Sequence, residues 1–288
     1  MKIQKSFRGN EESGTLYIVP TPIGNLQDMT YRGVSTLQAV DKIAAEDTRN
    51  TKKLTRHFEI TTPLISYHEH NQKSRAEELI GDLRDGKSVA LVSDAGMPGI
   101  SDPGEEIISQ AVDQDIPVVV LPGANAALVA LVGSGLPTEH FFYYGFLPRK
   151  KKERVAELER WKSFTKTLVF YESPHRLKQV IQDMYDVLGA RRVTLARELT
   201  KQYEEFLRGE LSEALAWVEE TELKGEFCIV LEGGVPEKGV SWWEDLTVIE
   251  HVETYEEEGM KNKEAIKKAA VDRGVPKREV YRVYHVEE

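Results

Sequence analysis

The stretch SVALVSDAGMPGISDPG, residues 88–104, indicates the fold class of this chain. Its first six residues are mostly apolar and β-branched, which is typical of a buried strand. The next eleven contain three glycines and two prolines, so they predict a stiff loop rather than a regular element. Apolar residues at helical spacing follow from Ile107 to Val112. A strand, a loop and a helix in this order predict part of a βαβ unit.

Similar apolar runs recur along the chain, and most are separated by segments with helical periodicity. They are TLYIV (15–19), DKIAAE (41–46), PVVVL (117–121), TLVFY (167–171), RVTLAR (192–197) and EFCIVL (226–231). This alternation predicts an α/β fold with a largely parallel first sheet. Residues 192–197 and 203–208 are expected to pair antiparallel, so the second sheet is expected to be mixed. ANAALVALV (124–132) is apolar nearly all round and predicts a buried helix.

Turn-rich segments at 133–139 and 233–239 divide the chain. We expect a disordered N-terminus at 1–13, an α/β domain at 14–133, a second α/β domain at 140–234 and a helical extension at 240–288. In the extension, Asn262 is expected to cap a helix that ends at Gly274. The residues expected to face inward are Ala265, Ile266, Ala269 and Ala270, followed by Val280, Tyr281 and Tyr284 on one side of a second helix. This helix-turn-helix layout fits nucleic-acid contact and protein packing equally well.

Composition excludes several classes of protein. Cys228 is the single cysteine, so no internal disulfide is possible, and we expect it to be buried on a strand in a reducing compartment. No apolar run reaches the roughly 18 residues of a membrane span, and the polar N-terminus is not expected to be a signal peptide. The net charge of −10 argues against a general nucleic-acid coat. Basic stretches at 49–57, 149–154 and 261–282 can still form local basic faces.

Common catalytic motifs are also missing from the sequence. No G-x-G-x-x-G follows the first strand, and no G-x-x-x-x-G-K-[ST] occurs, which disfavours dinucleotide-binding folds and P-loop enzymes. His68-Glu69-His70 lacks the spacing of a zinc site, so no metal is expected. No G-x-S-x-G elbow indicates a serine nucleophile.

Polar and turn-forming residues follow the strands rather than precede them. The segments are 20–25, 47–49, 94–104, 122–125, 172–176 and 197–201. Ligands of parallel sheets bind at the carboxyl ends of the strands, so two domains loaded at this edge predict a cleft between them. In the 94–104 loop, glycine lets backbone amides approach a ligand and proline limits the entropy lost on binding. Ser101 and Asp102 are expected to cap the helix that follows.

Nine motifs in a fixed order now indicate a family. They are TLYIVPTPIGNLQDMTYR, IAAEDTRNTKKL, SYHEHN, LVSDAGMPGISDPG, VLPGANAALVAL, YGFLPRK, FYESPHR, ARELTK and GEFCIVLEG, over roughly residues 15–233. This series resembles the tetrapyrrole methylase superfamily. EDTRNTKKL with YESPHR is most similar to its ribosomal-RNA branch, and KEAIKKAAVDRGVPKREVYRVYH is similar to the helix-turn-helix extension of that branch.

The resemblance implies S-adenosylmethionine as cofactor, held in a cleft between two α/β domains, together with a homodimer and a cytoplasmic location. The methyl acceptor that it implies is the ribose 2′-hydroxyl of a cytidine in the decoding centre of 16S ribosomal RNA. The implied cofactor-binding residues are Pro22, Asp94, Ala95, Gly96, Met97, Pro98, Gly99, Ile100, Ser101, Gly123, Asn125, Ala126 and Tyr171.

A ribose hydroxyl is a weak acid, so a base or a cation near the developing alkoxide is expected to help methyl transfer. Our candidates are Arg49 for the substrate or alkoxide and Asp47 or Glu198 for the proton. Structural ion pairs, Asp47 with Arg49 or Arg197 with Glu198, are the competing interpretation.

RNA is expected to contact two basic stretches, with the C-terminal bases as a further surface. The candidate residues are Arg49, Lys52, Lys53, Arg56, Arg149, Lys150, Lys151 and Lys152. Two alternative functions remain open: methylation of a small tetrapyrrole, and a non-catalytic ribosome-assembly factor that binds the cofactor without turnover.

Overall fold

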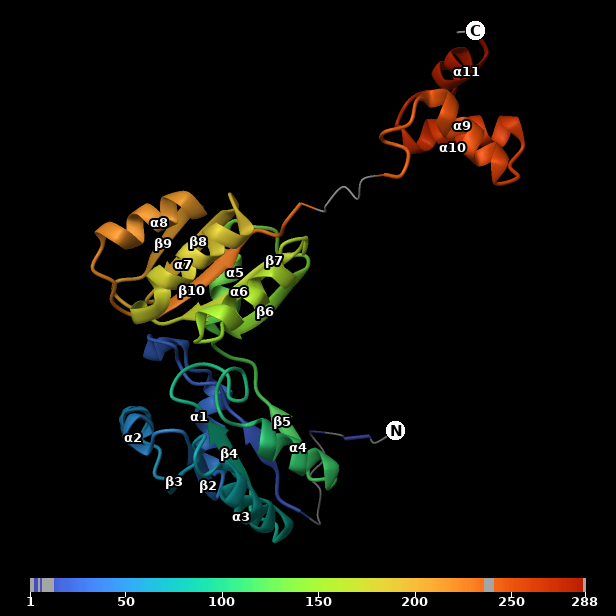
Figure 1. Cartoon of the computed structure of the whole chain (residues 1–288). Helices are drawn as coiled ribbons and strands as arrows, with labels where there is room; N and C mark the ends of the chain where they lie inside the picture. The colour runs from blue at the N-terminus through green and yellow to red at the C-terminus, as the bar shows by residue number, and fades with distance from the viewer. Residues whose placement is uncertain (1–2, 5, 7–12, 236–240, 287–288) are drawn as a thin grey trace. The chain divides into compact units, whose positions relative to one another are not determined.

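The computed structural model describes residues 3–4, 6, 13–235 and 241–286, which belong to two compact units, residues 1–235 and 236–288 (Figure 1). Most of the N-terminal segment expected to be disordered, and residues 236–239 of the expected linker, lie outside the described residues. Gln4 is described, and its side chain exchanges hydrogen bonds of 2.8 and 3.0 Å with the backbone of Val118. None of the helices in the described ranges is long and apolar enough to span a bilayer.

The first sheet of the larger unit is parallel throughout, with strand order β3-β2-β4-β1-β5. Its strands are β1 (Leu16–Ile18), β2 (Lys42–Ala45), β3 (Leu64–Ser66), β4 (Val89–Val92) and β5 (Val118–Val120). The helices are α1 (Tyr31–Ala39), α2 (Thr48–His57), α3 (Gln72–Arg84) and α4 (Glu105–Asp113), with a 3-10 turn at Leu26–Asp28. Leu79 of α3 and Ile107 of α4 share one core cluster, and Leu37 of α1 belongs to another.

The second sheet is mixed, with order β6-β7-β10-β8-β9. Only β6 and β7 pair in parallel, and the other neighbours are antiparallel. Its strands are β6 (Phe141–Phe146), β7 (Thr167–Glu172), β8 (Arg192–Arg197), β9 (Glu205–Glu210) and β10 (Phe227–Leu231). Its helices are α5 (Ala126–Ser134), α6 (Lys151–Arg160), α7 (Pro174–Leu188) and α8 (Leu211–Glu220). Helices α6, α7 and α8 contribute to one core cluster and α5 to another.

These elements confirm the predicted α/β class, the parallel first sheet and the mixed second sheet. The antiparallel pairing of 192–197 with the following strand is also confirmed. The predicted cap at Ser101 and Asp102 is wrong, because α4 begins only after Gly104, whose backbone turns at φ 155°. The prediction of a fully buried helix at 124–132 is wrong on one face, where Leu128, Val129 and Val132 are exposed.

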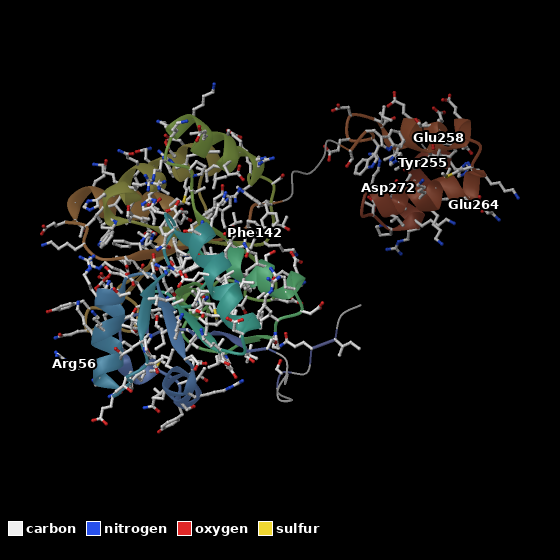
Figure 2. All side chains as sticks on the ribbon, turned by 90° about the horizontal axis from the view of Figure 1, so that it is seen from below. Arg56, Phe142, Tyr255, Glu258, Glu264 and Asp272 are labelled. Carbon is white, nitrogen blue, oxygen red and sulfur yellow. The ribbon has the colours of Figure 1, made fainter. Side chains whose placement is uncertain are left out.

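The C-terminal unit contains α9 (Val248–Glu257), α10 (Asn262–Asp272) and α11 (Lys277–Val286). Its core includes Ala265, Ile266, Ala269, Ala270 and Val280, as predicted, and Tyr284 packs against this core. Asn262 is the first helical residue rather than the cap, and Tyr281 is exposed rather than turned inward. The Tyr255 hydroxyl donates to Asp272 at 2.5 Å and ties α9 to α10 (Figure 2).

Candidate active site

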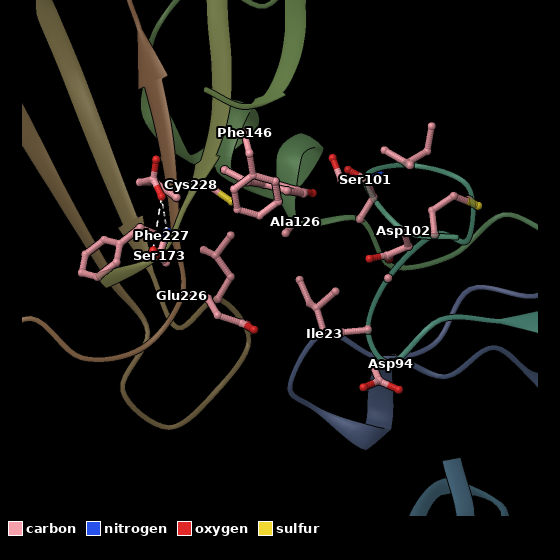
Figure 3. A pocket seen from close by; sticks show the side chains of 18 of the residues that line it. Ile23, Asp94, Ser101, Asp102, Ala126, Phe146, Ser173, Glu226, Phe227 and Cys228 are labelled. Carbon is pink, nitrogen blue, oxygen red and sulfur yellow. Dashed lines mark hydrogen bonds between the residues drawn. The ribbon is translucent and has the colours of Figure 1, made fainter. Parts of the chain in front are cut away.

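A cavity of about 410 Å³ opens where loops of the two sheets meet (Figure 3). The first sheet contributes Ile23, Glu46 and most of 94–102, and the second contributes Phe146, 171–174, Ala196, Leu199, Lys201 and 226–228, with Asn125 and Ala126 from the start of α5. Most of these positions lie at the carboxyl end of a strand or in the loop that follows it. The start of β10 reaches the same edge because β10 runs antiparallel to β7. The polar and turn-forming residues predicted to gather at the carboxyl ends of the strands therefore line a cavity.

The 94–104 loop is held in place by the loop that follows β1. Thr21 and Gly96 exchange backbone hydrogen bonds of 2.9 Å in each direction, and the Thr21 hydroxyl donates to the Ser93 carbonyl at 3.0 Å. Gly96 has φ 82°, a left-handed conformation that glycine adopts without strain. The two loops thus form one rigid wall of the cavity.

Contacts across the cleft join this wall to the second sheet. Ser101 Oγ lies 2.6 Å from the hydroxyl of Tyr143 on β6, and the Tyr143 ring meets the Tyr171 ring edge-on at 5.2 Å. The backbone N–H of Ala127 donates to the Tyr171 hydroxyl at 3.0 Å. Burial raises the pKa of both phenols, so they stay neutral and act as hydrogen-bonding groups.

Three carboxylates of the first sheet border the cavity, and they differ in their partners. Asp94 accepts hydrogen bonds from the Asp47 N–H at 3.1 Å and from the Asn50 amide at 2.9 Å. Burial raises the pKa of Glu46, which accepts from the Asp94 N–H at 3.3 Å. Burial and the charge of Glu46 raise the pKa of Asp102 to about 7.

Most of the predicted cofactor residues line this cavity. Those that do are Asp94, Ala95, Gly96, Met97, Ile100, Ser101, Asn125, Ala126 and Tyr171. Pro98, Gly99 and Gly123 are not among the lining residues, and Pro22 borders a neighbouring hollow instead. Gly123 has a packing role, since a Cβ there would lie 2.7 Å from the Pro20 side chain. Their assignment to cofactor binding stays a prediction.

The predicted catalytic residues are not among those that line the cavity. Asp47 caps α2 and pairs with Arg49 at 2.7 Å, and the hydrogen bond from Arg49 lowers the Asp47 pKa to about 2. Burial of Glu198 would raise its pKa, but hydrogen bonds from Lys201 and the Glu226 N–H outweigh it and the pKa falls. Arg197 pairs with Glu205 at 3.0 Å, so the Asp47–Arg49 pair is the one of the two expected ion pairs that forms.

The basic residues of α2 are accessible to solvent. Arg49, Lys52, Lys53 and Arg56 are all exposed, and Arg56 points outward from the helix (Figure 2). Lys53 borders a second hollow of about 190 Å³, which shares Asp94 with the main cavity. Helix α2 therefore presents exposed cations, of which Lys53 borders a hollow next to the main cavity.

The second basic stretch, at the start of α6, is also exposed. Lys150 pairs with Glu153 at 2.9 Å and Lys151 with Asp183 at 3.4 Å, while Arg149 and Lys152 are exposed without a described ion pair. The structure therefore keeps both predicted RNA surfaces accessible.

Several lining residues were not in the predicted cofactor site. They are Ile23, Glu46, Asp102, Phe146, Glu172, Ser173, Pro174, Ala196, Leu199, Lys201, Glu226, Phe227 and Cys228. The position of Glu46 and of 172–174 directly after apolar runs is a usable signal. Residues 226–228 precede or lie within their run, so only the antiparallel direction of β10 reveals them. Cys228 is buried on its strand as predicted, and burial raises its pKa to about 12, which leaves the thiol inert.

In the described part of the chain, no group of three or more His, Cys, Asp or Glu side chains is arranged to hold a metal ion.

Two α/β layers with a glycine-walled cavity at a shared strand edge also occur in solved structures of other proteins. Solved structures with this fold include uroporphyrin III C-methyl transferase from Thermus thermophilus, at TM-score 0.55 and 18% identity over 76% of this chain and 97% of that one. A crystal structure of diphthine synthase matches at TM-score 0.62 and 12% identity, over 76% and 90%.

The family model for Tetrapyrrole (Corrin/Porphyrin) Methylases matches residues 15–215, and the chain belongs to this family. Curated relatives named ribosomal RNA small subunit methyltransferase I are 55% identical in Halalkalibacterium halodurans and in Bacillus subtilis, each over 100% of both chains. A relative of the same name in Streptococcus pyogenes is 48% identical over 99% of both chains. The resemblance predicted from the motifs is confirmed.

Proposed function

We propose that this chain uses S-adenosylmethionine to methylate the ribose 2′-hydroxyl of a cytidine in 16S ribosomal RNA of the small subunit. The observation that carries the proposal is full-length identity of 55% to two relatives named for small-subunit ribosomal RNA methylation. Incubation of the purified chain with methyl-labelled cofactor and small subunits, followed by mapping of the labelled nucleotide, tests it. Label on a cytidine ribose supports the proposal, and absence of label in the RNA contradicts it.

The cavity fits this cofactor in size and in chemistry. Its volume of about 410 Å³ falls within the range of about 300–1,000 Å³ for small-molecule sites. Carboxylates of Glu46 and Asp94 suit the positive charges of the cofactor, and Phe146 and Tyr171 offer aromatic surface. When bound, S-adenosylmethionine supplies an activated methyl group. The protein residues position the acceptor, exclude water and handle its proton.

Arg49 is proposed to contact the RNA substrate from the rim of the cleft, where its side chain is 87% exposed. Proton transfer to Asp47 or Glu198 stays a prediction from the sequence. The variants Asp47→Asn and Glu198→Ala test it in single-turnover methylation, and rates near that of the unmodified protein in both would exclude the two residues as proton acceptors.

RNA binding is proposed to depend on the α2 cations. We expect Lys52→Ala/Lys53→Ala/Arg56→Ala to weaken small-subunit binding and to reduce the slope of log affinity against log salt by about 2, since each lost phosphate contact removes roughly 0.7–0.9. The control, Lys166→Ala/Lys178→Ala/Lys224→Ala, removes the same charge from exposed positions elsewhere. Equal slopes for the two variants, measured by filter binding, would remove α2 from the RNA surface.

Helix α11 is proposed as a further RNA surface rather than a protein-packing surface. Lys277, Arg278, Tyr281 and Arg282 are exposed on it, and the Tyr281 ring lies 4.4 Å from the exposed His285 ring. Cations beside exposed rings suit phosphates and unpaired bases.

A homodimer is proposed through the exposed face of α5. The adjacent residues Leu128 and Val129 lie one turn before Val132 on this helix, and Val132 is 75% exposed. We expect Val132→Asp to convert the dimer to a monomer in light scattering, because burying an unpaired carboxylate at an apolar interface is costly. Val271→Asp changes a residue that is 71% exposed in the other unit and should leave the dimer intact. A Val132→Asp dimer of unchanged affinity would exclude α5.

The alternatives predict different outcomes in the labelling experiment. A tetrapyrrole methyltransferase would label a small porphyrinoid without RNA, and a non-catalytic assembly factor would bind cofactor without releasing S-adenosylhomocysteine. A chain that modifies ribosomal RNA works where subunits are assembled, so we propose a cytoplasmic location.

A further inference from the structure

We propose that Asp102 is the catalytic residue that accepts the proton of the ribose 2′-hydroxyl, an inference that rests on the proposed function. As the 2′-oxygen forms its bond to the methyl carbon, the carbon–sulfur bond breaks and its electron pair stays on sulfur. The hydroxyl proton passes to the Asp102 carboxylate, so the step is balanced without another reactant.

Position is the first argument. Asp102 lines the cavity from the first sheet, and its carboxylate points into the space faced from the other side by Glu226 (Figure 3). An acceptor for the substrate proton must reach the bound hydroxyl, and residues outside the cavity wall are less well placed for this.

Availability is the second argument. Most other carboxylates of the cavity have partners, and Glu46 accepts a hydrogen bond from the Asp94 N–H at 3.3 Å. Glu172 pairs with Arg176 at 3.3 Å, Glu226 with Lys201 at 3.3 Å, and Asp94 holds the two hydrogen bonds described above. Among the described residues, no ion pair joins Asp102 to a lysine or arginine. Its lone pairs are therefore open to substrate.

Orientation is the third argument. Ser101, directly before Asp102, has φ 61° and is held by its contact with the Tyr143 hydroxyl. Such strained backbone in a non-glycine residue persists only where the surroundings enforce it, and it is common at functional sites. After Asp102, the backbone of Gly104 has φ 155°, and a Cβ at this position would crowd Gly99 and Leu91. The chain on both sides of Asp102 is thus fixed.

The charge environment supports this role. Burial, then the charges of Glu46, Asp94 and Glu226, raises the pKa of Asp102 to about 7, while the Ser93 hydrogen bond opposes the shift. Lys201, across the cavity, is neutralised by Glu198 and Glu226. A base with a pKa near neutrality combines sufficient basicity with a large deprotonated fraction at working pH.

The experiment is single-turnover methylation of small subunits at saturating cofactor from pH 5.5 to 9. For the unmodified protein we expect the rate to rise with pH around 7 and then level, because only the deprotonated carboxylate accepts a proton. Asp102→Asn should lower the rate about 100-fold or more and abolish this rise. Asp102→Glu should recover part of the rate, and Asp186→Asn, an exposed carboxylate on α7, should change nothing.

Two readouts separate catalysis from binding and folding. We expect the affinity of Asp102→Asn for S-adenosylhomocysteine, measured by calorimetry, to change less than about threefold. If Asp102 instead contacted the cofactor, its replacement would lower the affinity and the rate together. The thermal midpoint of Asp102→Asn at pH 8 should be equal to or above that of the unmodified protein, because the raised pKa makes the charged carboxylate a destabilising group above about pH 4.

A pH-independent rate in the unmodified protein, or a rate within threefold in Asp102→Asn, would overturn the inference. A loss of affinity as large as the loss of rate would also overturn it, because Asp102 would then be a cofactor-binding residue. Absence of any RNA labelling by the unmodified protein would instead contradict the proposed function.

Discussion

Replacement of Asp183 by alanine is expected to lower the free energy of unfolding by about 3–5 kcal/mol, because it leaves a buried arginine without its counter-charge. Arg154 on α6 and Asp183 on α7 pair at 2.6 Å, and each side chain is only 3% exposed. At about 2–4 °C per kcal/mol for a unit of this size, the thermal midpoint should fall by about 6–20 °C.

Loss of the Arg154–Asp183 ion pair should also disturb the basic stretch 149–152 that is predicted to contact RNA. Arg154 donates to the carbonyls of Pro148 at 3.2 Å and Arg149 at 3.0 Å, so this ion pair positions the start of the basic stretch 149–152. Asp186→Ala is the matched control, since Asp186 is an exposed aspartate on the same helix and its removal should cost within about 0.5 kcal/mol. Equal chemical-denaturation midpoints for the two variants would show that the buried pair contributes nothing.

Gly96→Val is expected to weaken S-adenosylhomocysteine binding by about 100-fold or more. Any side chain at φ 82° adds strain of about 1–2 kcal/mol, and a Cβ at Gly96 would lie 3.4 Å from Ile23 in the cavity wall. The branched valine must push against Ile23 or shift the bridge to Thr21, and either movement changes the cavity.

Gly86→Val provides the matched control for this prediction. Gly86 follows α3 with φ 87°, and a Cβ there would meet nothing within 4 Å. Both variants should therefore lose similar stability in thermal melting, while calorimetry should detect weaker binding only in Gly96→Val. Equal affinity in the two variants would mean that the 94–104 loop does not contact the cofactor.

Local patterns predicted the elements well, and they were less reliable about what each side chain faces. The run SVALVS and its relatives became strands because β-branched residues favour extended, buried backbone wherever they lie. The apolar segment 126–134 is helical as predicted, but periodicity alone could not show that one face of this helix stays exposed. The cap expected at Ser101 failed because tertiary contacts with Tyr143 hold that residue outside the helix.

By itself, the sequence determined the α/β class, the position of the glycine- and proline-rich loops and the family, since each depends on neighbouring residues or on motif order. Only the tertiary structure decided which acidic side chains have partners. Asp47 resembles a base in sequence but is paired with Arg49, whereas Asp102 resembles a helix cap but faces the cavity. The reason is physical: the basicity of a carboxylate depends on burial and nearby charges, which folding brings together from distant parts of the chain.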